Sequence, residues 1–346
     1  MDNSLKKKPL VSITIPCRNE VNHISGLLES ILRSDYNKDL IEIFIVDGMS
    51  DDGTIELLNE KYLSKYGNIK IIENTKQKTP YAFNLGIKES LGEIVVVLGA
   101  RHIISSNYIT EVVEVLTKKK EIGCVGGIVN NVYENRTSEI ISKSMASPFG
   151  IGFNNFRAIS KDTYVDTIGS PAFRKFIFDE LGYFDEDLTR NQDDDFSFRL
   201  NKAGYKILLK ANISIQYSVR SSFSKLFKQY KQYGYWKVFV NKKHKTVTTL
   251  RQLFPLLFLL SFPLFTIFIL INIKFIYVFL LEIFSYLLLN FIFALKANGF
   301  NLNCIFKQMY TCFILHFSYG LGYLEGILDF LILNKKPNKK NETLSR

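Results

Sequence analysis

Apolar and polar positions alternate along the first 220 residues in a pattern that predicts strands and helices in turn. Short apolar runs typical of strands occur at residues 11–16, 41–46, 69–73 and 93–98. Helical spacing follows the first three runs, at residues 22–32, 54–65 and 80–91. The run at 93–98 is almost continuous, as in strands that are buried on both faces of a parallel sheet. The pattern therefore predicts an open, mostly parallel α/β sheet.

The last hundred residues have long apolar runs instead. Residues 253–273 and 275–295 are each long enough to cross a hydrocarbon core, which needs about 20 residues, and only 272–274 can form the turn between them. A third apolar region, 305–333, carries polar residues at three- and four-residue steps, so we expect it either to span beside this hairpin or to lie in the interface. The expected domains are a cytosolic domain at 1–220, a basic amphipathic interfacial region at 221–250, membrane segments within 251–334 and a basic tail at 335–346.

Composition and charge narrow the class of protein. The chain has 346 residues, of which 47% are hydrophobic and 22% charged, so it is not a disordered chain. The net charge of +11 is concentrated between Phe196 and Leu281, where fourteen Lys or Arg residues occur without any Asp or Glu. Because this basic stretch leads directly into an apolar run, it favours an anionic membrane face over a nucleic acid as its partner.

The first residues and the cysteines indicate the compartment. No apolar segment follows the polar, basic start of the chain, so we expect no cleavable signal peptide and a cytosolic N-terminal part. The four cysteines have no metal-type spacing, and a reducing compartment is expected. The basic tail obeys the positive-inside tendency if it too is cytosolic, which favours an even number of membrane crossings.

Polar residues gather where three of the predicted strands end. Ligands of open α/β sheets bind beyond the carboxyl ends of the strands, here residues 16–20, 47–54 and 99–102. No glycine-rich dinucleotide fingerprint and no Walker lysine loop is present, which argues against a dinucleotide or ATP site of the usual kind. Carboxylates at these ends can accept hydrogen bonds from a nucleobase and a ribose. The alternative is that Asp47, Ser50 and Asp52 only cap the next helix.

Residues 11–20, 45–54 and 84–88 resemble the nucleotide-binding half of family 2 glycosyltransferases, which have the GT-A fold, a Rossmann-like open sheet. The resemblance continues through residues 165–167, 169–174, 181–186, 190–200 and 229–236. It covers about residues 9 to 240 and is greatest for the branch that builds succinoglycan-type exopolysaccharide, with similar membrane helices afterwards. It implies a multi-pass enzyme of the cytoplasmic membrane that inverts configuration as it moves a sugar from a nucleoside diphosphate sugar to a lipid-linked or growing saccharide.

The resemblance also implies the residues of the site. The donor-binding positions that match are Pro16, Arg18, Glu20, Asp47, Asn84, Gly99 and Arg101. The general base of the family is the Asp of a Glu-Asp pair, which matches Asp193 here, with Gln192 in place of the Glu and with Asp194 and Asp195 in the same turn. The same acidic run also suits the first turn of a helix, where it complements the helix dipole.

The family holds a divalent cation, Mg or Mn, with an Asp-x-Asp or Asp-x-His motif after the fourth strand. This chain has Gly99 where the first carboxylate stands, and its imidazole, His102, comes one place late. The sequence therefore leaves two interpretations open. His102 could still supply one metal ligand, or Arg101 could pair with the diphosphate and do part of what a metal does.

The segment 225–240 mixes lysines with aromatic residues and is expected to be an amphipathic helix at the membrane surface. Gln232 and Trp236 resemble the Gln-x-x-Arg-Trp signature of processive polysaccharide synthases, but Tyr235 stands where the Arg should be. Both residues are candidates for the acceptor site. Two alternatives to a single-addition transferase therefore remain, a processive synthase and a non-catalytic scaffold that binds sugar nucleotides.

Overall fold

The structure, a computed structural model, describes residues 8–152, 161–337 and 341. The chain divides into two compact units, the first formed by residues 1–130 and 159–217 and the second by residues 131–158 and 218–346. The chain enters the second unit twice, and after Tyr217 it stays there. The domain boundary expected from the sequence was at residue 220. Residues 131–158, however, group with the C-terminal helices rather than with the N-terminal sheet.

The first unit is built on a sheet whose parallel half was predicted from the sequence. Its four parallel strands are β1 (Val11–Cys17), β2 (Ile41–Asp47), β3 (Ile69–Glu73) and β4 (Ile94–Val97). The helices between them are α1 (Ile24–Leu32), α2 (Thr54–Leu58) with a π-helical turn (Asn59–Leu63), and α3 (Thr79–Glu89). Strand order is β3-β2-β1-β4, and Cys17 lies opposite Asp47 in register. The carboxyl ends of β1 and β2 are therefore adjacent.

The other half of the sheet is antiparallel and was not predicted. Beyond β4 the order in the described chain is β8-β6-β9-β5, with β7 paired to β9. These strands are β5 (Ile103–Ile104), β6 (Ile122–Val132), β7 (Thr163–Tyr164), β8 (Ala172–Arg174) and β9 (Lys206–Ser218). The remaining helices of this unit are α4 (Tyr108–Lys118), α7 (Phe176–Leu181), α8 (Gln192–Lys202) and a short 3₁₀ turn (Lys38–Leu40).

The parallel strands are held by burial on both faces. On one face Ile13, Ile45 and Val96 are fully buried in the larger core cluster, and on the other face Val46 is fully buried beside Ala82 of α3. Each such aliphatic side chain contributes about 1.5 to 3 kcal/mol relative to an exposed one. The strand ends are thus fixed on a rigid core, which is what a binding site at those ends needs.

The second unit consists of helices. They are α5 (Arg136–Ala146), α6 (Pro148–Ile151), α9 (Phe223–His244), a 3₁₀ turn (Leu250–Leu253), α10 (Phe254–Ile271), α11 (Phe275–Asn298), α12 (Leu302–Gly326) and a π-helical continuation (Ile327–Ile332). Among the described residues, two helical segments are long and apolar enough to cross a membrane, Leu250–Ile271 and Phe275–Asn298. They correspond to the predicted hairpin. Only Leu256 of α10 and Asn290 and Ala294 of α11 are buried, so these are not core helices of a soluble domain.

Helix α9 places part of its aromatic and polar side chains inside the second unit. Tyr235, Trp236 and Lys237 are fully buried, and Gln232 is only 2% exposed. The indole Nε1–H of Trp236 donates to the carbonyl oxygen of Asn341 at 3.0 Å. These side chains therefore form part of the core of the second unit, and the interfacial position expected for 221–250 stays a prediction.

The polar stripe predicted along 305–333 exists, and it faces protein. Thr311 and Ser318 are fully buried, Glu325 pairs with Lys231 at 2.6 Å, and Asp329 accepts a hydrogen bond from the Tyr235 hydroxyl at 2.9 Å. Lys231 and Tyr235 belong to α9. The polar face of α12 is thus satisfied by α9, and within the described chain α12 is not one of the candidate spans.

Gly322 is the point of closest approach between α9 and α12. A Cβ atom at this position would lie 1.8 Å from the carbonyl oxygen of Lys231, a backbone atom that cannot rotate away. We expect Gly322→Ala to destabilise the second unit by about 1 to 3 kcal/mol, as overpacking does in other cores. Thermal unfolding of the detergent-solubilised protein measures the effect. Gly67→Ala is the matched control, because no atom lies within 4 Å of the added methyl group there. Equal melting temperatures for the two variants would contradict the prediction.

Candidate active site

The turns after β1 and β2 are joined by hydrogen bonds. The backbone N–H of Asn19 donates to Ser50 Oγ at 2.9 Å, and its side-chain amide donates to Asp51 Oδ1 at 2.8 Å. The N–H of Asp51 donates back to Asn19 Oδ1 at 3.0 Å. Asn19 has a φ of 55°, in the left-handed region that Asn tolerates better than most residues. The two turns therefore form a single preorganised edge.

The carboxylates of Asp47 and Asp52 accept hydrogen bonds that fix the shape of this edge. The carboxylate of Asp47, which is 6% exposed, accepts hydrogen bonds from Ser50 N–H at 2.9 Å and Ser50 Oγ at 2.5 Å. Asp52 accepts from the N–H groups of Thr54 at 3.0 Å and Val21 at 3.2 Å. Burial alone would raise the pKa of Asp52, but the hydrogen bonds outweigh it and lower the pKa. Asp52 precedes Gly53, the N-cap residue of α2, and its hydrogen bonds fix the turn that follows Asp47.

Glu20 and Arg101, both candidates for the donor site, lie in contact. The Nε–H of Arg101 donates to both carboxylate oxygens of Glu20, at 3.1 and 2.8 Å. Glu20 is 6% exposed, whereas the Arg101 side chain is 36% exposed. His23, which was not predicted, lies with Nδ1 3.1 Å from the same carboxylate. This pair joins the end of β1 to the segment that follows β4.

His102 is held in its neutral form. The N–H of Gly99 donates to its Nδ1 at 3.0 Å, so Nδ1 carries no proton and the hydroxyl of Ser170, 2.7 Å away, donates to it as well. The remaining proton lies on Nε2. Burial lowers the pKa of His102 to about 4. Because the folded pKa is below that of the unfolded chain, this histidine favours folding above about pH 6.5 and loses that contribution as the pH falls toward 4.

The residues after β4 do not fit a cation held by carboxylates. A Cβ atom on Gly99 would lie 3.0 Å from Cε1 of His102, so an acidic side chain there requires the imidazole to move. Nδ1 of His102 already accepts two hydrogen bonds. Within residues 8–152, 161–337 and 341, no group of three His, Cys, Asp or Glu side chains is placed to bind a metal ion.

The three candidate aspartates at the start of α8 have different surroundings. Asp195 is fully buried and pairs with Arg199, at 3.0 Å from both its Nε and its terminal nitrogen. Arg199 also donates to the carbonyl oxygens of the preceding loop, those of Leu181, Gly182 and Tyr183. Asp194 is half-buried, and Asp193 is exposed. Asp195 is thus committed to the fold, and Asp193 is the aspartate most open to a substrate.

Asn84 has a structural role in addition to the predicted one. Its amide donates to the carbonyl oxygen of Phe184 at 2.8 Å and to Glu186 Oε1 at 2.9 Å, and its Oδ1 accepts the N–H of Phe184 at 3.0 Å. Both ends of the side chain are engaged, and Asn84 is 3% exposed. Its contact with a donor stays a prediction. Of the other predicted donor residues, Pro16 and Arg18 are half-buried beside the joined turns, and Arg18 packs where Gly48 has no side chain.

Ser170 and Arg199 are site-supporting residues that the sequence did not single out. Ser170 has a φ of 52° and contacts His102, while its carbonyl oxygen accepts the Tyr108 hydroxyl at 2.6 Å. Both Ser170 and Arg199 lie in stretches that carry the family resemblance, 169–174 and 190–200, but no role was assigned to them. Ser170 also lies between Gly169 and Pro171, which marks a special backbone turn.

Comparisons with known proteins identify the family to which the sequence is similar. The family model described as Glycosyl transferase family 2 matches residues 12–182. A dolichyl N-acetyl-glucosaminyl phosphate glucuronosyltransferase of Methanococcus voltae is 34% identical over 230 residues, 65% of this chain and 71% of that protein. The succinoglycan biosynthesis protein ExoA of Rhizobium meliloti is 27% identical over 247 residues, 70% of this chain and 74% of that protein.

Among solved structures, a GalNAc-T7 crystallised with UDP, GalNAc and Mn²⁺ has the same fold. The TM-score is 0.51 at 15% sequence identity, over 63% of this chain and 45% of that one. At this identity the likeness concerns the fold alone.

Proposed function

The chain belongs to glycosyl transferase family 2, and from this membership we propose that it transfers one sugar from a nucleoside diphosphate sugar to a lipid-linked or growing saccharide. The product serves the assembly of a cell-surface polysaccharide, and the anomeric configuration is inverted. The observation that carries the proposal is the preorganised edge formed by the ends of β1, β2 and β4. Its carboxylates and its arginine suit a nucleoside diphosphate, and the acidic turn of α8 supplies a base.

The lipid-linked acceptor is supported by the relative of highest identity named above, whose substrate is a dolichyl phosphate-linked sugar. The two apolar helices α10 and α11 support a membrane location, with the first unit on the cytosolic side. Such a location brings the enzyme to an acceptor that cannot leave the bilayer.

Asp193 takes the proton of the acceptor hydroxyl in this proposal. A general base must reach the substrate, and Asp193 is exposed at the start of α8 whereas Asp195 is buried and paired. The same loop keeps two polar atoms buried without a hydrogen-bond partner in the described chain, Thr189 Oγ1 and Gln192 Oε1. Buried acceptors of this kind cost free energy unless a ligand satisfies them, and sugar hydroxyls are suitable donors.

Arg101 stabilises the departing diphosphate in this proposal. Glu20 accepts only the Nε–H, which leaves the terminal N–H groups of the guanidinium for phosphate oxygens. Because the residues after β4 do not fit a carboxylate-bound cation, we assign this charge compensation to Arg101 rather than to Mg or Mn. His102 stabilises the turn that carries Arg101, because its Nδ1 accepts a hydrogen bond from the Gly99 N–H.

Membranes that contain the full chain are expected to convert one member of a panel of radiolabelled sugar nucleotides into a labelled lipid when lipid extract is added. Membranes with the Asp193→Asn variant are the control and should give little label. A product with one added sugar supports the proposal. A long labelled polymer would show a processive synthase instead, and no product from any donor would contradict transfer to lipid.

A further inference from the structure

The outward face of α12 and its π-helical continuation is an uninterrupted apolar stripe. Its members recur every three or four residues and thus share one helical face: Leu302, Phe306, Tyr310, Phe313, Phe317, Leu321, Leu324, Leu328 and Leu331. Phe306 is 64% exposed and Leu331 is 54% exposed. None of the nine is charged. Six of the nine are exposed, and the three in the middle, Phe317, Leu321 and Leu324, are half-buried. An apolar face with this exposure on a folded unit marks an interaction surface.

The face opposite the stripe is already occupied by α9. Gly322 and Gly326 of α12 approach the backbone of α9 at Lys231 and Tyr235, and Glu325 pairs with Lys231. Phe223 near the start of α9 packs on Tyr310, and Lys242 near its end donates to the carbonyl oxygen of Phe330. The two helices therefore run side by side over most of their length, and α9 leaves the stripe uncovered except at Tyr310, whose ring Phe223 contacts.

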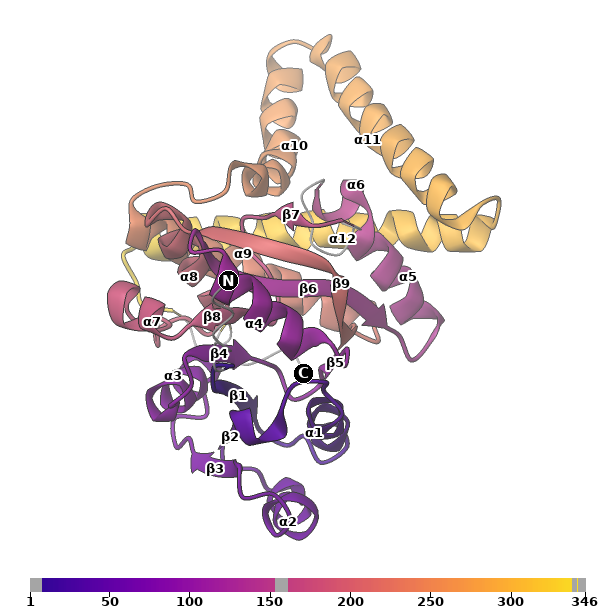
Figure 1. Cartoon of the computed structure of the whole chain (residues 1–346). Helices are drawn as coiled ribbons and strands as arrows, with labels where there is room; N and C mark the ends of the chain where they lie inside the picture. The colour runs from indigo at the N-terminus through magenta and orange to yellow at the C-terminus, as the bar shows by residue number, and fades with distance from the viewer. Residues whose placement is uncertain (1–7, 153–160, 338–340, 342–346) are drawn as a thin grey trace, which may run out of the picture. The chain divides into compact units, whose positions relative to one another are not determined.

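Helices α10 and α11 leave α12 from the side next to the stripe. Gly320 contacts the carbonyl oxygen of Pro255 at the start of α10, and His316 accepts or donates a hydrogen bond with the Tyr286 hydroxyl of α11 at 3.0 Å. Positions 316 and 320 border the stripe on the helical face, whereas the contacts with α9 lie opposite. Figure 1 shows α10 and α11 rising from the line of α12. A bilayer that contains α10 and α11 therefore also meets the stripe.

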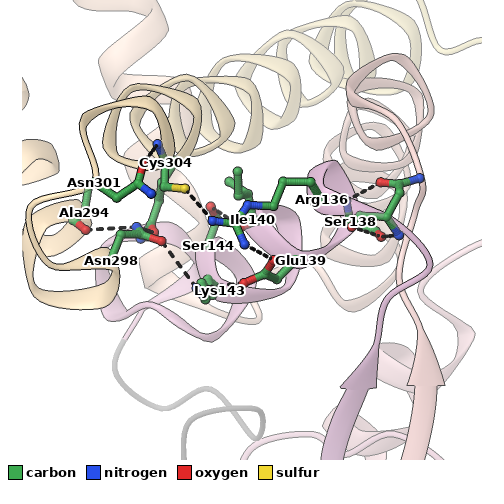
Figure 2. Close-up of polar contacts among 12 residues, drawn as sticks. Arg136, Ser138, Glu139, Ile140, Lys143, Ser144, Ala294, Asn298, Asn301 and Cys304 are labelled. Carbon is green, nitrogen blue, oxygen red and sulfur yellow. Dashed lines mark hydrogen bonds and ion pairs between the residues drawn. The ribbon is translucent and has the colours of Figure 1, made fainter.

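The turn between α11 and α12 is fastened to α5, which fixes the direction of α12. Figure 2 shows Arg136 contacting Cys304 Sγ at 2.9 Å and Lys143 contacting Asn298 Oδ1 at 3.5 Å. Asn301 caps the first turn of α12 through the N–H of Cys304. These contacts hold the first turn of α12 on a helix that does not enter the apolar hairpin.

Lysines surround the far end of the stripe. Lys242 contacts Asn334 Oδ1 as well as Phe330, and several exposed lysines lie near in sequence to these contacts: Lys243, Lys245, Lys335 and Lys336. An apolar face bordered by lysines is the pattern of a helix that lies on an anionic membrane.

We propose that α12 with its continuation lies in the plane of the membrane, with the stripe in the boundary between head groups and acyl chains. The occupant of this surface is a lipid bilayer that contains anionic lipid. A spanning orientation is disfavoured because α9 would enter the hydrocarbon with α12, and α9 carries exposed lysines at positions 225 and 228. At about 1.5 Å per residue, the stripe also extends over roughly 44 Å, more than a hydrocarbon core of about 30 Å.

Depth-dependent fluorescence quenching tests this orientation in the full chain, reconstituted in liposomes of phosphatidylcholine and phosphatidylglycerol. The four native cysteines are buried, so a polarity-sensitive label is attached after Phe306→Cys, Phe313→Cys or Leu331→Cys substitution. We expect each label to lose more fluorescence to a quencher near the head group than to one near the chain end, and all three to report the same depth.

Two controls calibrate the measurement. A label after Leu264→Cys, on the exposed face of α10, should be quenched more by the deep quencher, and a label after Leu91→Cys, exposed on the first unit, should not be quenched. A depth that changes from Phe306 to Leu331 would show a spanning helix and overturn the proposal. No quenching at the stripe, together with the mass of two chains, would show a second copy there and overturn it as well. The readout needs no turnover, so it is independent of the transferase function.

Discussion

Asp193→Asn is expected to lower the rate of sugar transfer by roughly 10²-fold or more while donor binding persists. The substitution keeps the shape of the side chain and removes the group that accepts the proton of the acceptor hydroxyl. Asp193 lies exposed in the first turn of α8, where an acceptor hydroxyl can approach it. Single-turnover transfer, measured beside donor affinity, separates the chemical step from binding.

The neighbouring aspartates provide matched controls. Asp195→Asn should lower the melting temperature rather than abolish chemistry selectively, because Asp195 is fully buried and holds Arg199, which in turn binds three carbonyl oxygens. Asp194→Asn should keep most of the activity. Near-normal turnover of Asp193→Asn with a large loss in Asp194→Asn would move the base by one residue.

Neighbouring acids illustrate a limit of reading a site from sequence. Asp193, Asp194 and Asp195 were equivalent candidates by composition and spacing. A helix turns by about 100° per residue, so consecutive side chains point in different directions and only one of them can meet a given substrate. The structure distinguishes them through Arg199, whose partners in the preceding loop carry no sequence pattern.

The strands that were predicted differ from those that were missed in how much local pattern they carry. Strands β1 to β4 have four to seven residues each, most of them apolar, and were recognised within about one residue at each end. Strands β5, β7 and β8 have two or three residues, too few for any period, and they pair with β9 or β4 over long sequence separations. These three strands were therefore not predictable from local pattern, whereas β6 and β9, with 11 and 13 residues, were missed in spite of their length.

Helices α9 and α12 show that a polar stripe on a helix can be predicted from sequence although the element that packs against it cannot. The polar stripe of α12 was recognised, but its partner is α9 and not water or lipid. The aromatic residues and lysines of α9 are equally typical of a membrane surface and of a helix that pairs with Glu325 and Asp329. The structure shows that the two helices touch through the glycine contacts at 322 and 326 and through these pairs.

Arg101→Ala is expected to weaken binding of the nucleoside diphosphate donor by roughly 10- to 100-fold and to lower turnover. A charged hydrogen bond contributes about 1.5 to 3 kcal/mol, and the terminal N–H groups of Arg101 are directed to phosphate in the proposed function. Arg101→Lys keeps the charge without the fork and should recover only part of the affinity. Chelator should leave wild-type turnover unchanged, since the residues after β4 do not fit a carboxylate-bound cation.

Arg101→Ala has two effects that must be told apart. It removes a group that binds the diphosphate, and it leaves the buried Glu20 carboxylate with His23 as its remaining partner. Glu20→Gln removes the charge while it keeps the shape, so the double variant Glu20→Gln/Arg101→Ala tells the two causes apart. If Arg101 binds the diphosphate, the double variant stays as weak as Arg101→Ala, and binding of the nucleoside alone is unchanged in both. Recovery in the double variant would assign the loss to the unpaired carboxylate, and loss of wild-type activity in chelator, restored by Mg or Mn, would assign charge compensation to a cation.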